Sequence, residues 1–396
     1  MGYLLQKETS TLPNQRFTNF GEGSQEETIT ETEKDKSVTD ELTEISSLSK
    51  KGYLNLNENR IEEAKNYFKK ILLVDENNNY ALVGLGDAAR KQECYKDAIH
   101  YYQRCLAIFP GNNYALFGLA DCYKALCQYH KAIEIWEQYI LHDDRNITVL
   151  TRVADAYRKV RNFKQSKAVY LRVLEMEENN AYAIIGLGHL HYDFREYREA
   201  LFYWEKMVKN NGKNVDIRVL TSIGNCHRKL KTFEDGLIYF EKALLLDNTN
   251  FYALFGLADC YRGMRQPEIA LEYWNRILES DPKNRIILTR AGDAYRNLND
   301  YSNAIDYYER ALNIEFDTYA GLGLALTAKA LGKIDEAVES LSRLIQQESK
   351  NYRLYLELAE CKLIKGEKQK AIEILEELQN LGVRNASIAE FLDKIS

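Results

Sequence analysis

The sequence predicts an all-α protein built from about ten stacked pairs of helices. The main observation is a small side chain that recurs ten times, and seven of the nine spacings between successive copies are 34 residues. The other two spacings are 36 and 33 residues. Self-similarity at such a period is typical of stacked supersecondary units rather than of one closed core. The residues of this small column are Ala64, Ala98, Ala132, Ser166, Ala200, Gly236, Ala270, Ala304, Ala337 and Ala371.

Two more columns keep the same register, as expected for helices that pack in pairs. A second small residue lies 12 residues before each member of the small column, and a large apolar residue lies four residues after it. Small residues on two helices let the backbones approach closely, and a bulky residue then fills the gap to the next unit. The first-helix small column is Gly52, Gly86, Ala120, Ala154, Gly188, Gly224, Ala258, Gly292, Ala325 and Ala359. The bulky column is Phe68, Tyr102, Trp136, Tyr170, Trp204, Phe240, Trp274, Tyr308, Leu341 and Leu375.

Within one unit the pattern includes Leu119, Ala120, Tyr123, Ala132 and Trp136, and Pro110 and Pro282 recur at the turns of two units. This pattern resembles the tetratricopeptide repeat (TPR) family over about residues 45–385. The resemblance implies a right-handed superhelix, an α-α solenoid, with a short capping helix over residues 386–396. The ten expected units are residues 45–78, 79–112, 113–146, 147–180, 181–216, 217–250, 251–284, 285–317, 318–351 and 352–385.

The first 44 residues differ from the repeats in composition. They contain ten acidic and four basic residues, and they are rich in Thr, Glu, Ser and Gln. Because large apolar residues are few, we expect residues 1–44 to form a disordered acidic tail. The tail is either a solubilising segment or a tether or self-masking segment. In the second case, Tyr3-Leu4-Leu5 or Phe17 and Phe20 would make the contact.

Charge and hydropathy narrow the class of protein. The whole chain and the tail each have a net charge of −6, so acidic and basic residues balance in the repeats. A neutral repeat region lacks the basic surface of a general nucleic-acid binder. The chain has no run of the ~20 apolar residues that span a bilayer and no signal-peptide core. We therefore expect a cytoplasmic protein without membrane insertion.

The seven cysteines and six histidines do not predict a metal site. Four cysteines lie two residues after the first-helix small column, where most other units have alanine, so we expect them to be small buried residues. We expect no metal and no cofactor because no zinc-ligand spacing is present. The sequence has no phosphate-binding loop or catalytic constellation, and we expect no enzymatic activity. The four cysteines are Cys122, Cys226, Cys260 and Cys361.

The most informative surface is the concave groove, which the resemblance implies is lined by the first helix of each unit. Two patterns alternate there: Tyr-x-x-Phe-Gly-x-x-Asp and Thr-Arg-x-x-Asp-x-x-Arg. Aromatic and arginine side chains frequently dominate binding surfaces, so we expect these positions to contact a partner. The candidate partner-binding residues are Tyr114, Phe117, Asp121, Arg152, Asp155, Arg158, Tyr182, Tyr252, Phe255, Asp259, Arg290, Asp293 and Arg296.

The recurring features of this groove have two explanations each. A glycine inside a helix costs about 0.5–1 kcal/mol relative to alanine, so Gly118 and Gly256 either open a notch beside an aromatic residue or allow a close helix contact. Likewise, Asp and Arg three residues apart either bind a partner or form ion pairs within one helix.

The sequence therefore favours a non-enzymatic scaffold that binds a protein or peptide segment in the concave groove. One alternative is a regulatory subunit or substrate receptor of an enzyme encoded elsewhere, and a weaker one is an RNA-binding repeat protein. The resemblance also allows a test for the TPR clamp that grips a chaperone's terminal carboxylate. That clamp needs Lys and Asn where this chain has Thr151, Asp155, Phe117 and Asp121, so we do not expect this type of binding. The identity of the partner and the oligomeric state do not follow from the sequence.

Overall fold

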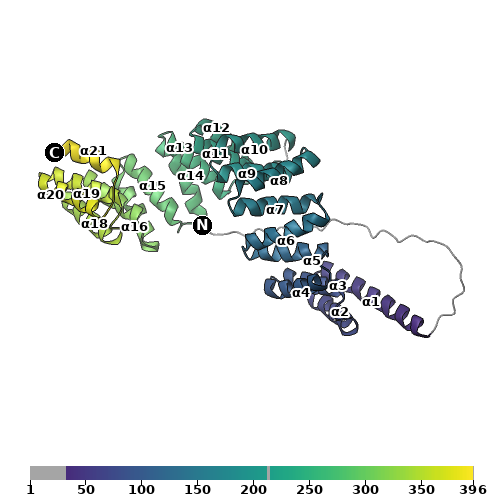
Figure 1. The fold of residues 1–396 in the computed structure, drawn as a ribbon. Coiled ribbons are helices and arrows are strands. Elements are labelled where there is room, and N and C mark those ends of the chain that lie inside the picture. The colour runs from purple at the N-terminus through teal and green to yellow at the C-terminus, as the bar shows by residue number, and fades with distance from the viewer. Residues whose placement is uncertain (1–32, 212–214, 396) are drawn as a thin grey trace. The chain divides into compact units, whose positions relative to one another are not determined.

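The computed structural model describes residues 33–211 and 215–395, and all regular secondary structure in these ranges is helical. The chain divides into two compact units, residues 1–118 and 119–396. The boundary lies inside helix α5 (Asn113–Ala125). Within each unit, successive helices form antiparallel pairs that stack side by side (Figure 1). Odd-numbered helices up to α19 are the first helices of the repeats, and even-numbered ones are the second helices.

The helix bounds follow the expected period. The first unit contains α1 (Glu33–Asn57), α2 (Ile61–Val74), α3 (Asn79–Lys91), α4 (Tyr95–Ile108) and the start of α5. The second unit continues with α6 (Tyr129–His142), α7 (Ile147–Lys159), α8 (Phe163–Met176), α9 (Ala181–Asp193), α10 (Tyr197–Asn211), α11 (Ile217–Leu230) and α12 (Phe233–Leu246). It ends with α13 (Phe251–Gly263), α14 (Pro267–Ser280), α15 (Arg285–Asn297), α16 (Tyr301–Ile314), α17 (Thr318–Ala330), α18 (Ile334–Gln347), α19 (Tyr352–Ile364), α20 (Lys368–Asn380) and α21 (Ala386–Ile395).

Asparagine caps determine where many first helices begin. The Oδ1 of Asn250 accepts the backbone N–H of Ala253 at 3.1 Å, which satisfies a donor that the first turn of α13 leaves unpaired. The Nδ2 of Asn250 also donates to Asp247 at 3.3 Å, so the cap is tied to the preceding turn. Equivalent caps are formed by Asn78, Asn112, Asn146, Asn180 and Asn284.

The turn between the two helices of each repeat contains one residue with a positive φ. This left-handed conformation is easy for glycine, yet only two of the ten repeats have glycine there. Other residues are strained in this conformation because their Cβ crowds the backbone. The ten residues are Asn59, Glu93, Cys127, Arg161, Arg195, Lys231, Arg265, Asn299, Gly332 and Gly366.

The structure confirms that the small column and the bulky column form the core. The three tryptophans of the bulky column are at most 1% exposed, and its other members are buried as well. The small column is also buried, including Ser166, whose hydroxyl donates to the carbonyl oxygen of Ala154 at 2.8 Å. This hydrogen bond explains how a polar side chain replaces alanine at the closest approach of two helices.

The glycines of the groove are explained by packing, and the hypothesis that they open a notch for a partner was wrong. A Cβ added to Gly256 would lie 2.2 Å from Phe240 of the preceding second helix, and one added to Gly186 would lie 2.3 Å from Tyr170. Such distances are far below van der Waals contact, so the ring occupies the space that the glycine leaves. In the first unit the same relationship joins Gly84 to Phe68 and Gly118 to Tyr102.

The amino-terminal helix is longer than expected. Helix α1 begins at Glu33, so residues 33–44 are helical rather than part of a disordered tail. Residues 33–44 contain neither Gly nor Pro and include several strong helix formers, which favour a helix despite the small number of apolar residues. The rest of the expected tail, residues 1–32, and residues 212–214 of the fifth expected unit lie outside the described residues. At the other end, α21 buries Ile388 against the last repeat.

Candidate functional site

Several first helices expose a tyrosine at their second position. Tyr182 is 77% exposed, Tyr252 is 61% exposed and Tyr319 is 69% exposed, all in the second unit. In the first unit, Tyr114 is also exposed and Phe117 is half-buried. Exposed tyrosines repeated along one set of helices provide amphipathic contact area with few rotatable bonds.

Several predicted site residues of the second unit form ion pairs between neighbouring first helices. Arg152 on α7 donates to Asp121 on α5 at 2.7 Å, and both side chains are mostly buried. Arg158 pairs with Asp155 of its own helix at 2.7 Å and also with Asp193 on α9. Although burial opposes it, the charge and hydrogen bonds of Arg158 lower the pKa of Asp155. These residues therefore stabilise the stacking of α5, α7 and α9.

A tyrosine of the bulky column, Tyr308, forms hydrogen bonds with two predicted site residues on α15. The hydroxyl of Tyr308 donates to Asp293 at 2.8 Å and accepts a longer bond from Arg296 at 3.4 Å. Although burial opposes it, the hydrogen bond with Tyr308 and the charge of Asp293 raise the pKa of Arg296. Asp293 and Arg296 thus provide the hydrogen-bond partners of the Tyr308 hydroxyl, whose ring is buried in the core.

Asp259 is the centre of a larger cluster on α11, α13 and α15. Its side chain is only 3% exposed, and it pairs with Arg228 at 2.6 Å, Arg290 at 2.8 Å and Arg262 at 3.1 Å. We refer to these four residues as the Asp259 cluster. Arg228 and Arg290 also lie over the ring of Phe255, at 5.9 and 5.1 Å from its centroid.

The Asp259 cluster has more positive than negative charge. Three guanidinium groups surround one carboxylate. Burial, followed by repulsion from Arg262 and Arg228, lowers the pKa of Arg290 despite the attraction of Asp259. A further anion beside these arginines would therefore be stabilised.

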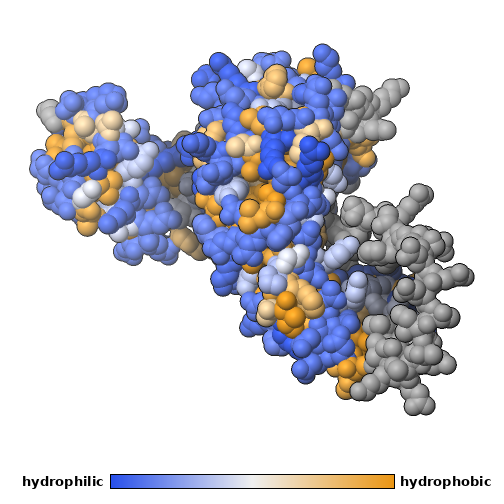
Figure 2. Space-filling model, turned by 45° about the vertical axis from the view of Figure 1, so that its right-hand side comes forward, coloured by the Kyte–Doolittle hydropathy of each residue, from blue (hydrophilic) through white to orange (hydrophobic). Residues whose placement is uncertain are grey.

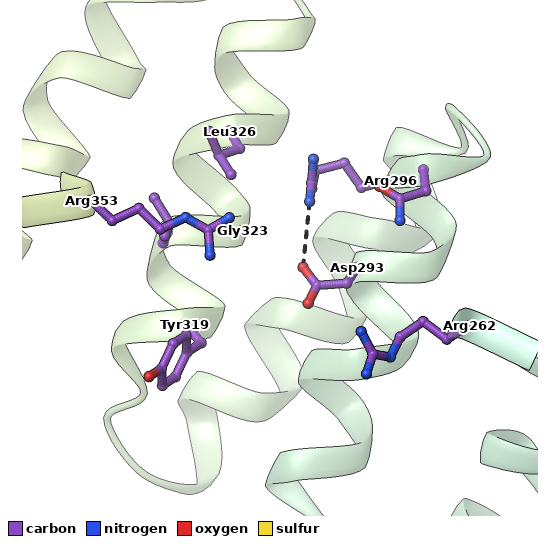
Figure 3. Close-up of a pocket in the computed structure, with 9 residues that line it drawn as sticks. Arg262, Asp293, Arg296, Tyr319, Gly323, Leu326 and Arg353 are labelled. Atoms are coloured by element: carbon purple, nitrogen blue, oxygen red, sulfur yellow. Dashed lines mark ion pairs between the residues drawn. The ribbon is translucent and has the colours of Figure 1, made fainter. Parts of the chain in front are cut away.

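A pocket of about 340 Å³ lies next to this cluster, between α13, α15, α17 and α19. Arg262, Arg296 and Arg353 point into it from three helices, and Asp293 lies between them (Figure 3). Asp293 pairs with Arg296 at 3.6 Å. Among the described residues the guanidinium of Arg353 meets no carboxylate within ion-pair distance. We call this site the arginine pocket.

A second hollow of about 620 Å³ adjoins the arginine pocket and shares Asp293 and Tyr319 with it. Exposed apolar side chains of Ile286 and Phe316 line this hollow. Acidic residues outnumber arginines in its lining, and Arg285 lies 3.5 Å from Asp317. We call this site the apolar hollow.

The structure therefore brings together Tyr252, Phe255, Asp259, Arg290, Asp293 and Arg296 on neighbouring first helices. Of the residues that line the arginine pocket, only Asp293 and Arg296 were predicted, and Arg262, Tyr319 and Arg353 are among those that were not. Arg262 occupies the same place in its repeat as Arg296, and Tyr319 and Arg353 occupy the place of Tyr252. The repeat register contains this signal, although Arg262 and Arg353 lie outside the two alternating motifs.

The cysteines behave as the register predicts. Cys105, Cys122, Cys226, Cys260 and Cys361 are buried, and burial raises the pKa of the Cys226 and Cys260 thiols to about 12. These thiols are therefore poor nucleophiles near neutral pH.

Stacked helix pairs with small and bulky columns define a helical-repeat protein. Tetratricopeptide repeat models match residues 50–113 and 255–320, residues 89–151 and 328–395, and residues 147–180 and 217–250. The chain belongs to the tetratricopeptide repeat family. No protein with a curated description matches it.

Several solved structures resemble this chain. A tetratricopeptide repeat protein from Parabacteroides merdae is 16% identical with a TM-score of 0.43, and the match covers 72% of this chain and 99% of that one. Pseudomonas aeruginosa pilF is 19% identical with a TM-score of 0.46, and the match covers 56% of this chain and 98% of that one. YrrB, described as a TPR protein with an unusual peptide-binding site, is 21% identical with a TM-score of 0.41, and the match covers 47% of this chain and 95% of that one.

The surface is mixed in character. Figure 2 shows apolar residues in separate patches among hydrophilic ones on the face in view. Across the described ranges, none of the helices combines the length and apolar character needed to cross a bilayer.

Proposed function

We propose that this protein is a non-enzymatic scaffold that binds a segment of a partner protein on the first helices of residues 119–396. The observation that carries the proposal is the exposure of Tyr182, Tyr252 and Tyr319 at the same position of three first helices. Exposed tyrosines beside buried arginine networks resemble the composition of energetic centres in protein interfaces. The seven cysteines, none of which forms a disulfide, support a cytoplasmic location.

The inter-helix ion pairs revise the role of some predicted contact residues. Arg152 already forms an ion pair with Asp121, and Arg158 already forms ion pairs with Asp155 and Asp193. In this proposal these pairs hold the first helices in position, while the exposed tyrosines and the arginines with surplus charge contact the partner. The proposal therefore places the binding surface mainly on α9 to α19.

The test compares exposed side chains on first and second helices. The full chain is used to isolate a partner, whose affinity is then measured for the double variant Tyr182→Ala/Tyr252→Ala. The matched control is Phe202→Ala/Ile238→Ala, which removes two exposed apolar side chains from α10 and α12. Loss of interface aromatic anchors typically weakens binding by roughly tenfold or more, so the tyrosine variant should bind weakly and the control normally.

Circular dichroism would establish that both variants keep their helical content. If the partner bound the tyrosine variant with unchanged affinity, or if only the control variant lost binding, the assignment of the first helices would be wrong.

A further inference from the structure

The arginine pocket and the apolar hollow together define a two-part surface on α13, α15, α17 and α19. In the Asp259 cluster and the arginine pocket, five guanidinium groups are present with two carboxylates, Asp259 and Asp293. Both carboxylates already have arginine partners. Positive charge is therefore in excess within this group of residues, so the pocket is complementary to an added anion.

The three arginines of the pocket suit a carboxylate in geometry as well as charge. A guanidinium group presents its N–H donors in a planar fork, which binds a carboxylate through two parallel hydrogen bonds. Arg262 and Arg353 approach the pocket from opposite sides, and the carboxylate of Asp293, which pairs with Arg296, lies between them (Figure 3). Half of the Arg262 side chain is exposed, so its remaining donors are accessible from the groove.

The apolar hollow sets a second requirement for the occupant. It continues from the arginine pocket past Tyr319, and it exposes Ile286 and Phe316. Its own arginines are matched by acidic groups, so it attracts apolar surface rather than a second anion. The acidic groups Asp317 and Glu348 also repel an extended polyanion such as RNA.

We propose that this surface binds an acidic and apolar peptide segment of a partner protein. A side-chain carboxylate of the segment pairs with Arg262, Arg296 and Arg353, and a nearby apolar side chain covers Ile286 and Phe316. This inference rests on the proposed scaffold function and specifies the chemistry of the segment that the first helices bind.

The test uses short fluorescent peptides with amidated carboxyl ends and the full protein, with binding measured by fluorescence anisotropy. A peptide with a single glutamate beside two leucines should bind. Replacing glutamate by glutamine removes the charge, and replacing leucine by serine removes the apolar surface, so each change should weaken binding by roughly tenfold or more. A glutamine and leucine peptide with a free terminal carboxylate separates the two sources of carboxylate. If it bound and the amidated glutamate peptide did not, the proposal would fail.

Variants locate the site. Arg262→Gln/Arg353→Gln should weaken binding of the glutamate and leucine peptide by roughly tenfold or more, and added salt should have less effect on what remains. Arg310→Gln/Arg343→Gln is the matched control, because it removes the same charge from second helices α16 and α18. Ile286→Ser should reduce affinity for this peptide but not for the glutamate and serine peptide.

Several results would overturn the inference: equal binding of the glutamate and glutamine peptides, equal loss in the control variant, or tighter binding of single-stranded RNA than of the peptide. Its failure is distinguishable from failure of the scaffold proposal. If the isolated partner still depended on Tyr182 and Tyr252 while the acidic peptide did not bind, only the chemistry assigned to the arginine pocket would be wrong.

Discussion

The ring of Phe240 fills the space that a side chain at Gly256 would need. A Cβ at Gly256 would lie 2.2 Å from the Cζ of Phe240, and a Cβ at Gly224 of the other neighbouring first helix would lie 2.7 Å from the same atom. One aromatic side chain is therefore held between glycines of two successive first helices. The stack depends on this close contact, because each repeat buries its core only against its neighbours.

Replacing Gly256 by alanine should destabilise the protein, although alanine is the better helix former. The methyl group overlaps the Phe240 ring, and overpacking of this kind costs about 1–3 kcal/mol in the free energy of unfolding. Urea denaturation followed by circular dichroism measures the change. Adding Phe240→Leu to Gly256→Ala should recover part of the loss, since the two residues are in contact. An unchanged or higher stability of Gly256→Ala would show that the ring moves aside at little cost.

Neutralising Asp259 should be more damaging than neutralising an exposed aspartate. Asp259→Asn leaves Arg228, Arg262 and Arg290 without their shared carboxylate, and loss of one partner of a buried ion pair costs on the order of 3 kcal/mol. Asp306→Asn, which removes an exposed partner of Arg310, is the control and should change stability by about 0.5 kcal/mol or less. Similar unfolding midpoints for the two variants would contradict a central role for Asp259.

Glycine should stabilise the turn between helices wherever another residue has a positive φ. Lys231, with a φ of 63°, has the same conformation as Gly332, with a φ of 77°. Lys231→Gly removes the steric cost of the left-handed conformation and should raise the free energy of unfolding by about 1 kcal/mol. Gly332→Ala should lower it by a similar amount, and a Cβ there meets no neighbour, so backbone conformation alone is responsible. A loss of stability in Lys231→Gly would refute this explanation.

His189 should make stability depend on pH in the mildly acidic range. Burial, followed by the positive charge of Arg158, lowers the pKa of His189 to about 4. The unfolded chain takes up this proton near the ordinary pKa of about 6.5, whereas the folded chain does not until about pH 4. Stability from this group is therefore complete above pH 6.5 and decreases as the pH falls from 6.5 to 4.

The His189→Gln variant isolates this effect from the titration of other groups. Between pH 7 and pH 5 the wild type should lose about 2 kcal/mol more stability than the variant, as measured by urea denaturation at each pH. Equal losses in the two proteins would mean that His189 is protonated equally in the folded and unfolded states. The charges of Asp155, Asp193 and Lys159 also affect the pKa of His189, so neither protein should carry a substitution at these three residues.

The sequence predicts the core of this protein well because its packing is local and repeated. The register of Ala132 and Trp136 recurs in every repeat, so each pair of helices packs a small residue and a bulky residue in the same places. The role of Gly256 could not be read from the same pattern. A glycine that opens a notch and a glycine that receives a ring give identical sequences, and only the position of Phe240 distinguishes them.

The candidate site was predicted less completely, for a different physical reason. Motifs within one helix identified Asp259 and Arg290 separately, but their ion pair joins helices 31 residues apart in sequence. Likewise, Arg353 lies outside both motifs and reaches the arginine pocket only because α19 follows α17 in the stack. Contacts between repeats thus decide which arginines are paired and which retain surplus charge.

Amide hydrogen exchange of the full chain with and without its isolated partner would show directly which helices the partner covers. We expect bound partner to slow exchange in the first helices α9, α13, α15, α17 and α19, where the exposed tyrosines, the arginine pocket and the apolar hollow lie. The second helices α14, α16 and α18 should exchange as they do in the free protein. Protection confined to these second helices would contradict the assignment of the first helices as the binding surface.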